Sequence, residues 1–147
     1  MEEMTTDQIF HMLDDARRVG MTDYVVWGGE PLLRDDLPAV VASANKKGLD
    51  NTLITNGSLL PEKIDEIAQN LYGLIVSIDH PEAEKHDKLR RKKGVYRKAI
   101  EGIERAKEYR HLNILMNCVI QKGNISQLEG MVKLAEEMGV KITFEMM

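Results

Sequence analysis

One pattern constrains the fold more than any other: amphipathic helical segments alternate with short apolar runs along the whole sequence. The short runs are rich in β-branched residues and apolar at successive positions, which is typical of strands buried on both faces. We expect strands at residues 24–27, 52–55, 74–78, 114–120 and 142–144. Such repeats predict an α/β fold of about five parallel strands, either a barrel or an open doubly wound sheet.

The helical segments carry their own start signals. Residues 5–8 have the Thr-x-x-Gln form of a capping box, and residues 126–129 have the related form Ser-x-x-Glu. Asp36 is expected to cap another helix, and Pro61 to open a further one. Residues 80–94 are highly charged and lack apolar periodicity, so we expect a long connection there.

Composition limits the partners and the setting. With 147 residues, 43% of them hydrophobic, the chain is expected to form a single domain over residues 1–147. Its net charge of −4 lacks the excess of positive charge that is typical of proteins binding nucleic acid or an anionic membrane surface. The sequence has one cysteine, no signal peptide and no run of about 20 apolar residues, so we expect a cytoplasmic protein.

Polar residues and glycines follow several of the expected strands. In parallel α/β folds the ligand site lies beyond the carboxyl ends of the strands, so these residues are the candidates for binding. They are Gly28, Gly29, Glu30 and Pro31, then Thr55 and Asn56, then Ser77 and Asp79, and finally Asn117. Paired glycines let a backbone approach a ligand closely, and a neighbouring carboxylate can bind an ammonium group. The set suits a ligand that combines an amino acid with a ribose. The alternative is that each motif only ends its strand with a turn.

Three of these runs, Gly28-Gly29-Glu30-Pro31, Thr55-Asn56-Gly57 and Ser77-Ile78-Asp79, resemble the successive signatures of the radical S-adenosylmethionine (SAM) superfamily. The resemblance covers nearly the whole chain. It implies a partial six-unit (β/α) barrel, of which this chain supplies strands two to six. It also implies an enzyme that cleaves SAM reductively to a 5′-deoxyadenosyl radical with a [4Fe-4S] cluster.

The resemblance assigns roles to the residues at the carboxyl ends of the strands, which together form the rim of the barrel. Gly28, Gly29 and Glu30 would meet the methionyl amino group, and Ser77 and Asp79 the ribose or carboxylate region. Asn117 would meet methionyl or ribose atoms, and the backbone near Phe144 the adenine. Thr55 and Asn56 would line the same rim. Residues 86–90, followed by Gly94-Val95-Tyr96, also resemble the loop after the fourth barrel strand in members that act on peptides or small metabolites. That likeness makes Arg90 a candidate carboxylate partner, although its run of four basic residues is also typical of a solvated loop.

The sequence departs from this family in its cysteines. Members hold the cluster with a CxxxCxxC loop, whereas Cys118 is the only cysteine here and lies in an apolar strand segment. We therefore expect Cys118 to be buried rather than a ligand, and expect no metal ligands in this chain. Either the parent protein is longer and a missing N-terminal segment holds the cluster, or the chain is a natural relative that lost it. The sequence favours the first, because it opens on the helix that would follow the cluster loop.

Three functions are compatible with these observations. The first is the SAM-binding part of a radical SAM enzyme, inactive alone, with an unknown small-molecule or peptide substrate and a separate reductant protein. The second is a non-catalytic module that binds SAM or another nucleoside. The third is a metal-independent barrel enzyme of the aldolase or decarboxylase type, using Lys122 or Glu30 in acid–base work. The four histidines lack zinc-ligand spacing, and only His80 and His86 are candidates for substrate contact.

Overall fold

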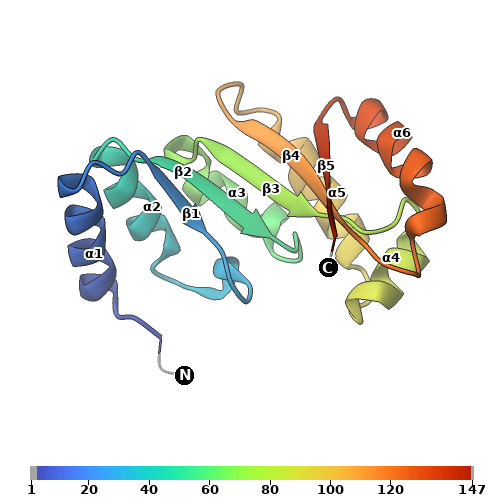
Figure 1. Ribbon diagram of the computed structural model, residues 1–147, viewed down its shortest axis with the longest axis horizontal. Coiled ribbons are helices and arrows are strands. Elements are labelled where there is room, and N and C mark those ends of the chain that lie inside the picture. The colour runs from blue at the N-terminus through green and yellow to red at the C-terminus, as the bar shows by residue number, and fades with distance from the viewer. Residues whose placement is uncertain (1–2, 147) are drawn as a thin grey trace.

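The computed structural model describes residues 3–146, which form five strands and six α-helices in alternation, with two helices between β3 and β4 (Figure 1). The strands are β1 (Asp23–Val26), β2 (Asp50–Thr55), β3 (Gly73–Ser77), β4 (Asn113–Ile120) and β5 (Lys141–Met146). The α-helices are α1 (Thr6–Arg18), α2 (Leu37–Lys46), α3 (Leu60–Ile67), α4 (Ala83–Arg90), α5 (Val95–Ala106) and α6 (Leu128–Met138). Three short 3-10 turns are η1 (Pro31–Leu33), η2 (Ala68–Asn70) and η3 (Ile125–Gln127). All five predicted strands are confirmed, and no helix within residues 3–146 is long and apolar enough to cross a membrane.

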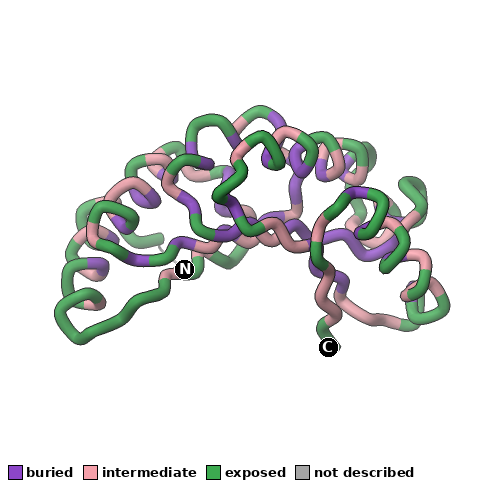
Figure 2. Tube along the Cα trace, turned by 90° about the horizontal axis from the view of Figure 1, so that it is seen from above, coloured by how far each residue is buried: buried purple, intermediate pink, exposed green. Residues whose placement is uncertain are grey.

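The strands form one sheet in the order β1-β2-β3-β4-β5, and every neighbouring pair is parallel. A doubly wound sheet would reverse its winding direction partway, but here each crossover leads to the next strand along. Figure 2 shows the outcome, a sheet bent into an arch with its helices along the outer side. Of the two architectures that the sequence allowed, the structure therefore adopts the partial barrel.

The helix-facing side of the sheet holds the main hydrophobic core. Leu53, Leu74 and Met116 are fully buried there, in one cluster with the apolar stripes of α3, α5 and α6. A smaller cluster joins α1 to α2 through Leu13 and Val40. Burying one large apolar side chain contributes about 1.5–3 kcal/mol relative to exposure. Packing against the sheet therefore holds these short helices in place.

The concave side of the sheet carries two rows of side chains that differ in polarity. Strand register aligns the members of each row across the sheet. The apolar row consists of Ile54, Ile75 and Leu115, all half-buried. The polar row lies two residues nearer the carboxyl ends and consists of Ser77, Asn117 and Thr143. A ligand on this side would thus meet hydrogen-bonding groups above an apolar floor.

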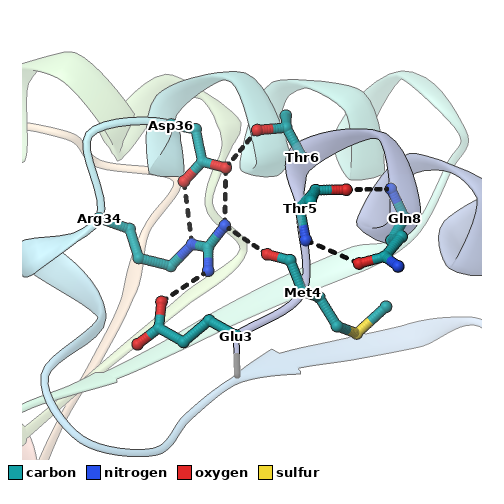
Figure 3. A network of polar contacts seen from close by, with 7 residues as sticks. All are labelled: Glu3, Met4, Thr5, Thr6, Gln8, Arg34 and Asp36. Carbon is teal, nitrogen blue, oxygen red and sulfur yellow. Dashed lines mark hydrogen bonds and ion pairs between the residues drawn. The ribbon is translucent and has the colours of Figure 1, made fainter. Parts of the chain in front are cut away.

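A polar network ties the start of α1 to the segment that follows β1 (Figure 3). The predicted capping box is confirmed, because Gln8 N donates to Thr5 Oγ1 (3.3 Å) and Thr5 N donates to Gln8 Oε1 (2.9 Å). Arg34 donates from Nε and Nη2 to the two carboxylate oxygens of Asp36 (2.9 and 2.7 Å), and Thr6 Oγ1 donates to Asp36 Oδ2 (2.6 Å). The Arg34 hydrogen bonds hold the pKa of Asp36 below its usual value. The network fixes the start of α1 against the segment that follows β1.

Three sequence predictions need correction. Asp36 stands at the N-cap of α2 but makes no capping bond, because Arg34 and Thr6 occupy its carboxylate. The capping box at residues 126–129 is wrong, since Gln127 precedes α6 and its side chain caps nothing. Residues 80–94 contain α4, which was not predicted because this helix is mostly charged and buries only His86.

Candidate functional site

The carboxyl ends of the strands bring most of the predicted site residues to one rim. They are Gly28, Gly29, Glu30 and Pro31 after β1, Thr55 and Asn56 at the end of β2, Ser77 and Asp79 at the end of β3, and Asn117 in β4. Phe144 differs, because its side chain packs against the main core on the helix-facing side of β5. Only the Phe144 backbone, which the sequence analysis also named, is available to a ligand on the concave side.

Gly28 and Gly29 form an open stretch of backbone at the end of β1. Their φ angles are +104° and +57°, and a Cβ built at either position would meet no atom within 4 Å. Residues other than glycine rarely adopt such backbone angles. The open space lets a ligand reach the backbone itself. Pro31 follows at the start of η1 and is buried, so it shapes this loop from inside.

The Glu30 carboxylate is engaged within the chain. Thr55 Oγ1 donates to Oε1 (2.7 Å), Asn56 N donates to Oε2 (2.9 Å), and Leu32 N also donates to Oε1 (3.2 Å). A carboxylate has about four lone-pair positions, so one remains for a ligand. The structure therefore adds a clamping role, joining the loop after β1 to the end of β2. The predicted contact with an amino group stays a prediction.

The end of β2 is a tight turn built by its own side chains. Gly57 N donates to Thr55 Oγ1 (3.0 Å), and Ser58 N donates to Asn56 Oδ1 (2.8 Å). This is the turn chemistry that the simpler interpretation of Asn56-Gly57 proposed. The side chains of Thr55 and Asn56 therefore stabilise the turn after β2, in addition to any contact with a ligand.

Asp79 is the centre of a buried polar cluster that joins β3, α4 and β4. The residue is only 4% exposed, and Val119 N donates to its Oδ1 (3.1 Å). Its backbone N–H donates to His86 Nδ1 (3.0 Å), and its carbonyl accepts from Asn124 Nδ2 (2.8 Å). Direct contact between the Asp79 carboxylate and a ligand is thus limited by the partners it already has.

Arg90 lies beside this cluster with unsatisfied hydrogen-bonding capacity. Its Nε is 2.7 Å from Asp79 Oδ2, so the two side chains form an ion pair. Neither Nε nor Nη2 has a hydrogen-bond partner of good geometry among residues 3–146, although both atoms are buried. A buried donor without a partner is costly unless a ligand completes it. Arg90 is therefore the rim residue best suited to an anionic group.

Two histidines expected at the substrate are instead enclosed by the protein. His80 and His86 are 1% and 0% exposed, and His80 Nδ1 accepts a hydrogen bond from Glu82 N (3.0 Å). Burial, together with the positive charge of Arg90, lowers the pKa of His86 to about 4. His86 is thus neutral at pH 7 and helps to hold Asp79. The expectation of substrate contact needs correction for both residues.

The described residues do not fit an iron–sulfur cluster. No group of three or more His, Cys, Asp or Glu side chains in residues 3–146 could hold a metal ion. Cys118 is fully buried in the main core, as predicted. Burial and the nearby Asp79 charge raise the pKa of its thiol to about 11, which disfavours the thiolate that a metal needs.

Sequence reasoning missed two residues that build the site. Asn124 is fully buried and donates to the carbonyl oxygens of both Asp79 and Val119. Thr143 lies in the polar row, where its Oγ1 donates to Asn117 Oδ1 (3.2 Å). The position of Asn124 just after a strand is a signal that could have revealed it. Thr143 carries no such signal, because only the strand register shows its neighbour.

Comparison with known proteins gives one family. The sequence model of the Radical SAM superfamily matches residues 1–141. The AdoMet-dependent heme synthase of Methanosarcina barkeri (strain Fusaro) is 33% identical over 139 residues, covering 93% of this chain and 40% of the relative. The probable GTP 3′,8-cyclase of Pyrobaculum aerophilum is 32% identical over 136 residues, covering 87% of this chain and 43% of the relative. The chain thus spans well under half the length of these two relatives.

A solved structure shares the fold at low sequence identity. Streptococcus suis SuiB bound to S-adenosylmethionine superimposes with a TM-score of 0.85 at 16% identity. The match covers 99% of this chain and 35% of SuiB. At this identity the likeness concerns the fold alone.

Proposed function

Because the chain belongs to the radical SAM superfamily, we propose that it forms the SAM-binding part of an enzyme that cleaves SAM reductively to a 5′-deoxyadenosyl radical. The described residues do not fit the [4Fe-4S] cluster that this chemistry needs. The cluster would therefore be held by residues outside this chain and reduced by a separate protein. Alone, the chain would bind SAM without cleaving it.

One combination of features carries the proposal: the Gly28-Gly29 backbone is open at the carboxyl end of β1, and Arg90, paired with Asp79 after β3, has two guanidinium nitrogens without a hydrogen-bond partner among residues 3–146. SAM carries an ammonium group and a carboxylate on one carbon. The backbone carbonyl groups of the two glycines are complementary to the ammonium group, and the Arg90 guanidinium is complementary to the carboxylate. We assign the ammonium group to the carbonyl groups of Gly28 and Gly29 and to the remaining lone pair of Glu30. We assign the carboxylate to Arg90 and Ser77.

The rest of SAM would follow the polar row across the sheet. Asn117 and Thr143 provide groups for the ribose hydroxyls, and the backbone beside Phe144 would take the adenine. Asp79 is proposed to position Arg90 rather than to touch SAM, because its carboxylate is already held by Arg90 and Val119 N. Thr55 and Asn56 would support the rim through the Glu30 clamp.

SAM titration of the isolated chain tests this proposal. Trp27, the only tryptophan, is 79% exposed directly before Gly28, so its fluorescence should respond to binding. Arg90→Met should weaken binding about 10-fold or more, the effect of losing a hydrogen bond to a charged group. Arg91→Met, at the next and exposed position, is the matched control and should leave the affinity unchanged. A chain that does not bind SAM, or an Arg90→Met variant that binds it equally well, would exclude the proposal.

A second candidate is a non-catalytic SAM-binding module, which the absence of cluster ligands among residues 3–146 favours. Reading the coding sequence upstream of Met1 for a CxxxCxxC motif separates the two candidates. The aldolase or decarboxylase alternative has no support of this kind. Lys122 is exposed on the loop after β4, and the Glu30 carboxylate is engaged by three hydrogen bonds.

A further inference from the structure

We propose that residues 85–98 form the docking surface for an acidic electron-transfer protein, the reductant of the proposed reaction. The inference rests on the proposed function and names the partner that it requires. This basic segment comprises most of α4, the turn that follows it and the start of α5. It holds eight of the 20 Lys and Arg residues of the chain but only one of the 24 Asp and Glu residues. A chain with net charge −4 thus carries a strongly positive region.

Most of the cations in the basic segment have no negative partner. Three of them pair with carboxylates outside the segment at 2.6–2.7 Å, and these are Lys85, Arg90 and Lys98. The other five are exposed and form no ion pair with residues 3–146; they are Lys88, Arg91, Lys92, Lys93 and Arg97. Five uncompensated cations exceed what the single carboxylate of SAM can use. They are complementary to a larger surface of negative charge.

The turn between α4 and α5 has a defined shape, which a freely solvated run of basic residues would lack. Arg91 ends α4 with a φ of +54°, the only positive value among the non-glycine residues that the structure describes. The Asp87 carboxylate accepts hydrogen bonds from Gly94 N and from Tyr96 N (2.9 Å). The one acidic residue of the segment therefore shapes the turn and neutralises none of the cations. A surface that is ordered before docking loses less entropy when it binds.

The basic segment adjoins the rim where SAM is proposed to bind. Its Arg90 pairs with Asp79 after β3, and its Lys92 Nζ donates to Ser58 Oγ (3.0 Å) after β2, while α4 itself follows the carboxyl end of β3 (Figure 1). In the proposed reaction one electron passes from the donor, through the cluster, to SAM. The bond between the SAM sulfur and the 5′ carbon then breaks to give methionine and the radical. A donor docked on the basic segment would lie beside the site that receives its electron.

A nucleic acid fits the basic segment less well than an acidic protein does. Domains that bind nucleic acid carry net positive charge, and single strands stack their bases on exposed aromatic rings. Here the net charge is −4, and both rings of the segment are enclosed. His86 is 0% exposed, and Tyr96 packs edge-on against it and donates from its hydroxyl to Pro81 O (2.9 Å). Electron-transfer complexes need only a local interface, below about 1,200 Å², with complementary charge.

Binding of a plant-type ferredoxin, an acidic electron donor with a [2Fe-2S] cluster, tests the inference. It is titrated into the full chain, which carries a fluorescent label, and anisotropy reports the complex. We expect saturable binding that weakens about 10-fold or more as the ionic strength rises from about 0.01 M to about 0.1 M, because the Debye length falls from about 30 Å to about 10 Å.

Two double variants separate the basic segment from the overall charge. Lys88→Glu/Lys93→Glu should weaken ferredoxin binding about 10-fold or more at the lower ionic strength. Lys46→Glu/Lys141→Glu makes the same change in net charge at two exposed lysines that form no ion pair among residues 3–146. Lys46 also matches Lys88 in its position, since each lies in the last turn of its helix. This control should bind ferredoxin nearly as well as the unmodified chain.

Three results would overturn the inference. They are no binding of ferredoxin, equal weakening by both double variants, and tighter binding of a single-stranded RNA oligonucleotide than of ferredoxin in the same buffer. The urea midpoint of each variant is measured alongside, and Lys88→Gln/Lys93→Gln replaces the reversed pair if that pair unfolds.

SAM titration of the same proteins separates this inference from the proposed function. Lys88→Glu/Lys93→Glu should leave SAM affinity unchanged, because neither side chain is assigned to SAM. A chain that binds SAM but not ferredoxin would refute the docking surface alone. A chain that binds ferredoxin through the basic segment but does not bind SAM would refute the proposed function alone.

Discussion

Glu30 shows how one side chain can serve both the fold and the ligand. Its carboxylate accepts hydrogen bonds from Thr55 Oγ1, Asn56 N and Leu32 N, so it joins two loops of the rim. Sequence reasoning selected Glu30 for the charge it offers to an amino group. The clamp could not be foreseen, because Thr55 and Glu30 are 25 residues apart and meet only through the pairing of β1 with β2.

Glu30→Ala should lower the free energy of unfolding by about 1.5–3 kcal/mol, the range for hydrogen bonds to a charged group. It should also weaken SAM binding, since the rim loosens and one acceptor is lost. Glu30→Gln should be little better, because its amide NH₂ would face one of the donors. Urea unfolding and SAM titration measure the two effects. Glu129→Ala, at an exposed site, is the control and should change neither. Unchanged stability and binding in Glu30→Ala would contradict both roles.

His86 should make the stability of the protein depend on pH. Burial lowers its pKa from 6.5 to about 4 in the folded state, so between these values the unfolded chain binds a proton that the folded chain does not. The free energy of unfolding should therefore fall as the pH drops from about 6.5 to about 4, by up to about 1.4 kcal/mol per unit. His86→Asn keeps an acceptor for Asp79 N–H but does not titrate. Urea unfolding across this pH range should show a smaller slope for His86→Asn than for the unmodified chain, and equal slopes would rule out the effect.

At the scale of elements, two glycines allow α5 to pack closely against α3 and against the turn that precedes α3. A Cβ at Gly57, where φ is +77°, would lie 2.6 Å from Ala99 Cβ and 2.8 Å from Ala99 Cα. A Cβ at Gly102 in α5 would lie 2.6 Å from Leu60 Cγ in α3. These close approaches explain why the turn after β2 can lie directly against α5.

Gly57→Ala should therefore destabilise the protein markedly, because it adds overpacking of about 1–3 kcal/mol to the cost of a positive φ. Gly139→Ala is a matched control, since Gly139 also has a positive φ (+67°) but open space around its Cβ position. Thermal unfolding of the two variants isolates the packing contribution. If Gly57→Ala unfolds at the same temperature as Gly139→Ala, the close contact with Ala99 does not matter.

At the scale of the whole molecule, the arch of the sheet leaves two open edges. β1 and β5 are the outermost strands, and each pairs on one side only within residues 3–146. Unpaired strand edges tend to pair with other chains. We therefore expect the isolated chain to self-associate with rising concentration, as measured by analytical ultracentrifugation. A compact monomer at high concentration would speak against an open partial barrel.

The isolated chain should also fail to acquire a [4Fe-4S] cluster. Anaerobic reconstitution with iron and sulfide should give no stoichiometric cluster absorbance, because the single thiol of Cys118 is buried and three thiolates are needed. Cys118→Ala should therefore show the same iron content as the unmodified chain. A four-iron cluster bound to the unmodified chain would disprove the assignment of the cluster to residues outside it.

The sequence alone determined the class of fold and the position of the rim. Apolar periodicity locates helices and strands because it records which side of each element is buried, and parallel strands must send their carboxyl ends to one edge. This is why the Gly28-Gly29 turn, Ser77 and Asn117 could be placed near one edge of the sheet in advance. The buried Cys118 followed from the same apolar pattern.

Only the tertiary structure decided how those elements combine. The choice of a singly wound arch and the α4 helix, whose His86 accepts a hydrogen bond from Asp79 N, both depend on contacts between distant segments. Such contacts leave no local periodicity, because a charged helix such as α4 is held by a few polar bonds and not by an apolar stripe. Strand register is likewise invisible in the local sequence. It alone brings Thr143 beside Asn117 and aligns the row of Ile75 with the row of Ser77.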